Sequence, residues 1–124
     1  MVNERFQSKF VPADLNYTLE TIISKGAINS RIKDYHDVIL IIREDGLIDS
    51  KKLKKTVPTT FAHRQTAMKF PVSFDAQGTE SLERLWRNHL NRLGKFKQTL
   101  GLPETIKLVL QEINGWMAQQ GFIS

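Results

Sequence analysis

A dense group of charged side chains in residues 29–37 is the first candidate for chemistry. Arg31, Lys33, Asp34, His36 and Asp37 lie within seven residues, directly before an apolar run. On a helix, Asp34 and Asp37 share one face, and Lys33 and Asp37 form an i,i+4 pair. Two carboxylates one turn apart beside a lysine can hold a cation or position a phosphate group. Spacing alone favours the alternative, a solvent-facing helix start with ion pairs worth about 0–1 kcal/mol each.

Metal and nucleophile chemistry finds little support in the sequence. The three histidines, His36, His63 and His89, have no ligand spacing, and His63 is expected at the surface. The chain contains no cysteine, which excludes disulfides, thiolate zinc sites and cysteine nucleophiles. It also lacks a Gly-rich phosphate loop, a G-x-S-x-G motif and a D-x-D pair. We therefore expect no metal site, no cofactor and no complete catalytic constellation.

Basic side chains suggest a second kind of site. The net charge is +5, from 18 Lys and Arg against 13 Asp and Glu, which favours weak attraction to nucleic acid or to an acidic partner. The candidate phosphate contacts are Lys51, Lys52, Lys54, Lys55 and Arg64, with Lys69 at the end of the same stripe. A second basic cluster comprises Arg84, Arg87, Arg92, Lys95 and Lys97. The alternative for both is an ordinary solvated helix face.

Apolar residues recur at spacings of three and four, which predicts helices over about 15–26, 30–44, 51–69, 79–101 and 103–121. The expected N-caps are Asn29 or Ser30, Asp49 or Ser50, and Thr79, with Pro103 as the first helical residue of the last helix. Pro58 should kink the third helix or start a new one, because proline lacks the backbone N–H. Trp86 and Trp116 lie on apolar stripes and are expected in the core rather than as base-stacking surfaces.

Length and composition are those of one globular domain. The prediction is a single all-α bundle of about five helices over residues 1–124, with an irregular N-terminal arm over 1–16. No run of about 18 apolar residues occurs, so no membrane span is expected. The first residues lack the apolar core of a secretory signal, and the absence of cysteine fits a reducing compartment. We expect a cytoplasmic protein.

Three segments and one tryptophan of the chain resemble one protein family. Residues 29–37 resemble the "NSR-x-KD-x-x-D" segment of the AbiEii/AbiGii-type nucleotidyltransferase toxins of type IV toxin–antitoxin systems. Residues 60–66 are similar to the "TF-x-x-R-x-T" element of these toxins, and residues 17–23 to their "Y-x-LET" segment. Trp86 falls where the family has a recurrent tryptophan. The similarity extends over most of the chain from Tyr17 onward.

The resemblance implies the C-terminal helical half of such a toxin. Family members carry a nucleotidyltransferase core first, with a Gly-Gly-Thr turn and a metal-binding D-x-D pair, and neither motif occurs here. The family's "AEK-L-x-A" helix is also absent or compressed, and Lys25 does not match its lysine by context. Only Lys33, Asp34 and Asp37 carry over as vestigial site positions, since this helix faces the nucleotide pocket in the family.

The resulting expectation is a truncated toxin-like domain that is catalytically inactive alone and acts by binding protein or nucleic acid. The protein partner would be a separate core domain or an antitoxin, and the nucleic acid would be RNA. Two alternatives stay open: a small basic nucleic-acid-binding module, and one part of a transferase completed in trans. Self-association is a further expectation, because loss of a partner domain exposes apolar surface.

Overall fold

Six helices make up a computed structural model that describes residues 13–26, 32–44, 46 and 48–123. They are α2 (Ala13–Lys25), α3 (Ile32–Ile42), α4 (Ser50–His63), α5 (Ala76–Leu93), α6 (Phe96–Leu100) and α7 (Ile106–Gln119). The predicted all-α bundle is confirmed. Residues 1–12 of the predicted arm and the predicted caps Asn29 and Ser30 lie outside the described residues. The prediction of an irregular arm is wrong for residues 13–16, which form the start of α2.

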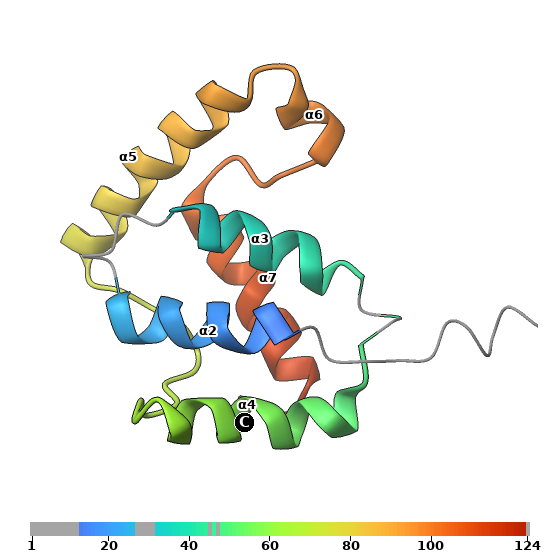
Figure 1. Cartoon of the computed structure of the whole chain (residues 1–124). Coiled ribbons are helices and arrows are strands. Elements are labelled where there is room, and N and C mark those ends of the chain that lie inside the picture. The colour runs from blue at the N-terminus through green and yellow to red at the C-terminus, as the bar shows by residue number, and fades with distance from the viewer. Residues whose placement is uncertain (1–12, 27–31, 45, 47, 124) are drawn as a thin grey trace, which may run out of the picture.

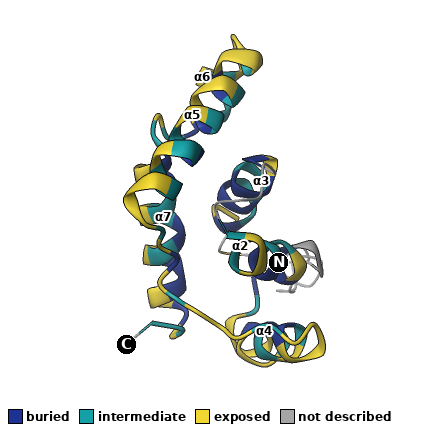
Figure 2. Ribbon diagram, turned by 90° about the vertical axis from the view of Figure 1, so that its left-hand side faces the viewer, coloured by how far each residue is buried: buried dark blue, intermediate teal, exposed yellow. Residues whose placement is uncertain are grey.

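The helices form two groups that enclose the core. In Figure 1, α2 lies between α3 and α4, while α7 crosses behind them and α5 extends away toward α6. Contacts between helices agree, because α2 touches α3 and α4, whereas α7 touches α3 and α5. Figure 2, turned by 90°, colours the ribbon by burial and shows buried residues in α7 and in α3 on the far side of the gap between the two groups. The five longer helices each contribute buried apolar residues to the core, whereas the short α6 contributes no fully buried residue.

The core is built by the apolar stripes that the sequence indicates. Leu15, Leu19 and Ile22 of α2 meet Val38 and Ile39 of α3, and all five are almost completely buried. The largest fully buried side chains are Trp86 and Phe61. Trp116 is also buried, so both tryptophans belong to the core, as predicted.

The third helix differs from its prediction at its end. Asp49 caps α4 by accepting a hydrogen bond from the Lys52 backbone N–H at 3.0 Å, which confirms one of the two expected caps. The helix continues through Pro58 and ends at His63, well before Phe70. It ends there because Gln65 adopts a left-handed backbone conformation (φ 57°), which no α-helix continues.

Two other helices begin at residues that differ from the prediction, because a different side chain caps each of them. Asp75, rather than Thr79, caps α5 by accepting a hydrogen bond from the Gly78 N–H at 2.7 Å. Thr105 caps α7, so the helix starts at Ile106 and Pro103 lies before it. The predicted segment 79–101 is divided at Gly94 into α5 and the short α6.

A bidentate ion pair joins the end of α3 to α7. Arg43 Nε lies 2.8 Å from Glu112 Oε2, and its second nitrogen donates to Glu112 Oε1 at 3.0 Å. The same guanidinium donates to the carbonyl oxygens of Leu100 and Gly101. Hydrogen bonds to Glu112 raise the pKa of Arg43, and the pair fixes the chain after α6 against α3.

Within the described residues, no helix is long and apolar enough to cross a membrane.

Candidate functional site

A cleft of about 730 Å³ opens between α2, α3 and the end of α4. Its lining residues are Tyr17, Thr18, Thr21, Asp34, Asp37, Leu40, Ile41 and Arg64. Three segments that are distant in the sequence thus meet at one place. The cleft combines two carboxylates, a guanidinium, two hydroxyl groups and one phenol ring, and a volume of this size accommodates a small organic ligand.

The α3 wall of the cleft carries the predicted carboxylates. Asp34 and Asp37 lie about one turn apart on α3: Asp34 is 6% exposed and flanks the buried stripe beside Val38, whereas Asp37 is half-buried. Lys33 is exposed but does not line the cleft, and the described residues show no ion pair between Lys33 and Asp37. The structure therefore brings two of the three predicted positions, Asp34 and Asp37, into one cavity.

Glu20 on α2 carries a buried carboxylate, which the sequence did not single out. It holds Arg64, the residue after α4 that lines the cleft. Glu20 is only 2% exposed and forms an ion pair with Arg64 Nε. The Thr66 hydroxyl donates to the second carboxylate oxygen of Glu20 at 2.6 Å. The left-handed turn at Gln65 directs Arg64 and Thr66 toward the same carboxylate.

The pKa of Glu20 reflects this balance. Burial alone would raise the pKa, but hydrogen bonds from Thr66 and Ser24 and the positive charge of Arg64 outweigh it. The net pKa lies below the ordinary value of the carboxyl group. Glu20 is therefore ionised at neutral pH and holds Arg64 at the rim of the cleft.

Tyr17 separates the cleft from a second, smaller cavity. The Arg64 guanidinium lies 5.6 Å from the centre of the Tyr17 ring, a cation–π distance. On the α4 side, a groove of about 310 Å³ is lined by Asn16, Tyr17, Lys55, Thr56, Thr59 and Thr60. Tyr17 is 50% exposed and lines both cavities.

Four lysines lie on the exposed side of α4. Lys51, Lys52, Lys54 and Lys55 are all exposed, and none has an ion pair within the described part of the chain. Lys55 lines the groove beside Tyr17, whereas Lys54 lies next to Gly121. Arg64 does not continue this lysine face, because Glu20 holds its guanidinium at the cleft.

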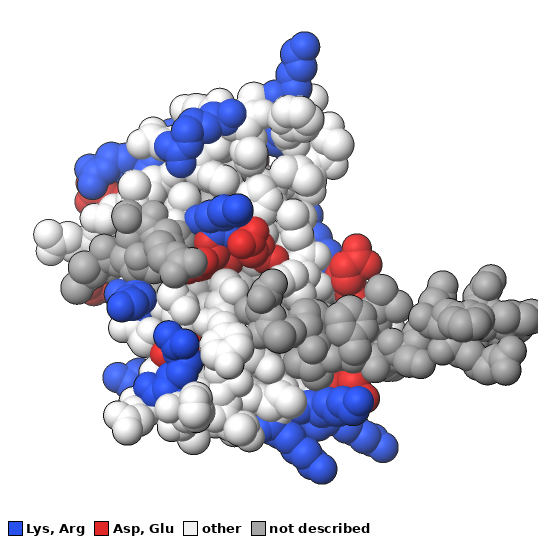
Figure 3. Space-filling model, viewed as in Figure 1, with Lys and Arg blue, Asp and Glu red and all other residues white. Residues whose placement is uncertain are grey.

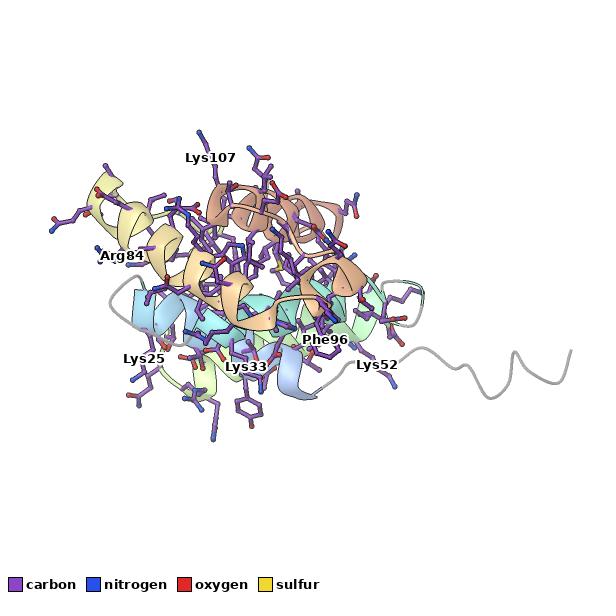
Figure 4. The ribbon with its side chains drawn as sticks, turned by 90° about the horizontal axis from the view of Figure 1, so that it is seen from above. Lys25, Lys33, Lys52, Arg84, Phe96 and Lys107 are labelled. Carbon is purple, nitrogen blue, oxygen red and sulfur yellow. The ribbon has the colours of Figure 1, made fainter. Side chains whose placement is uncertain are left out.

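The distribution of charge on this side of the molecule is uneven. Figure 3 shows acidic side chains in the middle, at the level of α3, with basic side chains above them along α5 and below them along α4. Seen from above, Lys25 and Lys33 lie on one side of the molecule and Lys107 on the opposite side (Figure 4). On α5, Arg87 lies 3.7 Å from Glu83, so part of the second basic cluster is neutralised.

Two histidines that sequence spacing left unrelated are in contact between α3 and α5. His36 Nδ1 and His89 Nε2 are 2.8 Å apart, and the His89 ring also lies against Trp86. His63 is exposed, as predicted. The described residues contain no group of three or more side chains suited to hold a metal ion.

Acid is expected to weaken this histidine contact. Burial lowers the pKa of both His36 and His89 below 6.5, and for His89 the neighbouring His36 and Arg92 lower it further. Lys33 acts in the same direction, while Asp37 opposes it. The unfolded chain then takes up protons before the folded chain does, so stability should fall as the pH drops below about 6.5.

Denaturant unfolding at pH 7 and pH 5 measures this effect. We expect a smaller loss of stability at pH 5 in His89→Gln than in the unmodified chain. His63→Gln is the matched control and should retain the full loss. Equal pH dependence in all three proteins would contradict a role for the pair.

A scan against protein-family models finds no match, and searches of the curated proteins and of the solved structures also find none. The similarity to the AbiEii/AbiGii-type toxins therefore stays a prediction from the sequence segments.

Proposed function

We propose that this chain is an RNA-recognition module, similar to the C-terminal helical part of the nucleotidyltransferase toxins and without transfer activity of its own. The observation that carries the proposal is the lysine face of α4, which has no ion pair within the described part of the chain and whose Lys55 lines the groove beside Tyr17. Lysine side chains with no acidic partner are free to neutralise phosphates, which supplies most of the affinity for a nucleic acid.

The chemistry of the cleft favours RNA over DNA. Half-buried Asp37 presents a carboxylate to the cleft, and a carboxylate accepts hydrogen bonds from sugar hydroxyl groups. The 2′-hydroxyl is the group that lets a protein distinguish RNA from DNA. An RNA oligonucleotide is therefore expected to bind more tightly than DNA of the same sequence.

Reversing the charge of the α4 lysines tests the proposal. With four phosphate contacts, the affinity of the unmodified chain for single-stranded RNA should fall by roughly 50-fold between about 50 and about 200 mM salt. Replacing Lys51, Lys52, Lys54 and Lys55 by Glu should abolish binding even at the lower salt concentration. Fluorescence anisotropy with a labelled oligonucleotide measures both.

A second quadruple variant controls for net charge. Arg84, Arg87, Arg92 and Lys95 are exposed on and after α5, and their replacement by Glu changes the total charge equally. We expect this variant to retain most of the RNA affinity. Unchanged binding in the α4 variant, or the same loss in both variants, would contradict recognition by α4.

A transferase completed in trans is the second candidate, favoured by the presence of Asp34, Asp37 and Arg64 in one cleft. Both candidates predict no label on RNA when this chain alone meets labelled nucleoside triphosphates, magnesium and RNA, and only the second predicts labelling once a separate nucleotidyltransferase core is added. We expect no label on RNA with this chain alone. Transfer by the isolated chain would overturn the non-catalytic proposal.

A further inference from the structure

The exposed ring of Tyr17 occupies a position that the proposed phosphate contacts do not explain. It is one of four large apolar or aromatic side chains described as exposed, with Met68, Phe96 and Leu108. Tyr17 lines both the cleft and the groove, whereas the other three line neither of these two cavities. An aromatic ring between two cavities is in reach of a ligand that extends from one to the other.

The surroundings of Tyr17 hold it in place. Its helix is anchored by Leu15 and Leu19, which are buried on either side of it in the sequence. The Arg64 guanidinium lies over the ring, and the buried Glu20 carboxylate fixes Arg64. A half-exposed ring that is already fixed loses little conformational entropy when a flat ligand stacks on it.

Each cavity offers groups suited to a different part of a nucleotide. On the groove side, the Lys55 ammonium and the hydroxyl groups of Thr59 and Thr60 suit a phosphate. On the cleft side, the half-buried carboxylate of Asp37 suits sugar hydroxyl groups. Between them, Tyr17 offers the only aromatic ring that lines either cavity in the described part of the chain.

We propose that Tyr17 is a stacking platform for an unpaired base of single-stranded RNA that passes from the α4 groove into the cleft. This inference rests on the proposed RNA recognition and adds the form of the RNA. A base inside a duplex is stacked on both faces and cannot reach a protein ring, whereas single strands and loops expose their bases. The structure therefore assigns the cleft to unpaired RNA. Duplex RNA would contact the α4 lysines only.

Binding of a single-stranded RNA and of an RNA duplex to the full chain tests the inference. A base–aromatic stack contributes enough that Tyr17→Ala should weaken single-strand binding by roughly 10-fold to 100-fold. Duplex binding should change by less than about 2-fold, because it uses phosphate contacts only. Tyr17→Phe keeps the ring and should restore single-strand binding, which separates stacking from a general loss of structure.

Phe96→Ala is the matched control. Phe96 is 68% exposed on α6 and lines neither cavity, so its removal should leave both affinities unchanged. Equal affinities of Tyr17→Ala and the unmodified chain for the single strand would overturn the stacking role. If the α4 lysine variant still lost RNA binding, recognition of RNA by α4 would stand, without stacking on Tyr17. Failure of the unmodified chain to bind any RNA would overturn both.

Discussion

Replacing Trp86 by alanine is expected to lower the free energy of unfolding by about 4 kcal/mol, the largest effect we anticipate for a single side chain. Trp86 is 0% exposed on α5, and its indole N–H donates to the Pro103 carbonyl oxygen at 2.9 Å. Truncation removes a large buried ring, leaves a cavity and deprives that carbonyl of its donor. It also removes the surface against which His89 lies. Denaturant unfolding measures the change.

Two further variants make this prediction decisive. A domain of this size is stable by only about 5–15 kcal/mol, so Trp86→Phe is needed in case the alanine variant does not fold. It keeps most of the ring, loses the hydrogen bond to Pro103, and should cost about 1–2 kcal/mol. Leu108→Ala is the surface control, because Leu108 is 47% exposed, and it should cost less than about 0.5 kcal/mol. A loss below about 1 kcal/mol for Trp86→Ala would contradict its place in the core.

Periodicity alone was sufficient to predict the helical class and the core faces. The repeat of Leu15, Leu19 and Ile22 is a property of one helix, and the structure buries all three. The same holds for Ile106, Val109 and Ile113 on α7. Such stripes can be found from sequence because the residues of one helix face are only three or four positions apart.

Helix ends were harder to predict, because several residues in each loop can act as caps. Asp75 and Thr79 both precede the apolar face of α5, and the structure uses the earlier one. Pro103 has a favourable conformation for the first turn of a helix, yet Thr105 caps α7. The carbonyl of Pro103 instead accepts the indole hydrogen bond of Trp86, a tertiary contact that no local pattern reveals.

The residues of the candidate site likewise divide into those that could be predicted from the sequence and those that could not. Asp34 and Asp37 could be paired from the sequence because one helix carries both. The contact of Glu20 with Thr66 joins residues 46 positions apart, and the contact of His36 with His89 joins residues 53 positions apart. Such pairs depend on how the helices pack. For Glu20 the sequence offers no signal of such a contact, because an acidic residue next to an apolar one is ordinary on an amphipathic helix.

The second large effect is expected from Arg64→Ala, which should lower the free energy of unfolding at pH 7 by about 3 kcal/mol. The guanidinium itself is 45% exposed, so losing its own contacts costs little. The cost arises because the Glu20 carboxylate, 2% exposed, keeps only the hydrogen bonds of its other partners. An ionised carboxylate left in a buried position without its cation is strongly destabilising.

The pH dependence of this loss distinguishes it from a simple packing effect. In the unmodified chain, the pKa of Glu20 is lowered, so its contribution is present above the ordinary carboxyl pKa and is lost as the pH falls. Without Arg64, the pKa of Glu20 should lie higher than in the unmodified chain, so the stability lost with Arg64 should shrink as acid protonates Glu20. The difference between the two proteins should therefore shrink between pH 7 and about pH 4, while the histidine effect cancels in the comparison.

A neutral partner completes the test. Glu20→Gln removes the buried charge, so adding it to Arg64→Ala should raise stability at pH 7 above that of Arg64→Ala alone. In the otherwise unmodified chain, Glu20→Gln should cost only about 1 kcal/mol, because the half-exposed Arg64 turns to water. The two substitutions are then non-additive, as contacting residues should be. Additive losses, together with a difference that does not change with pH, would show that Arg64 stabilises the cleft by some means other than the charge of Glu20.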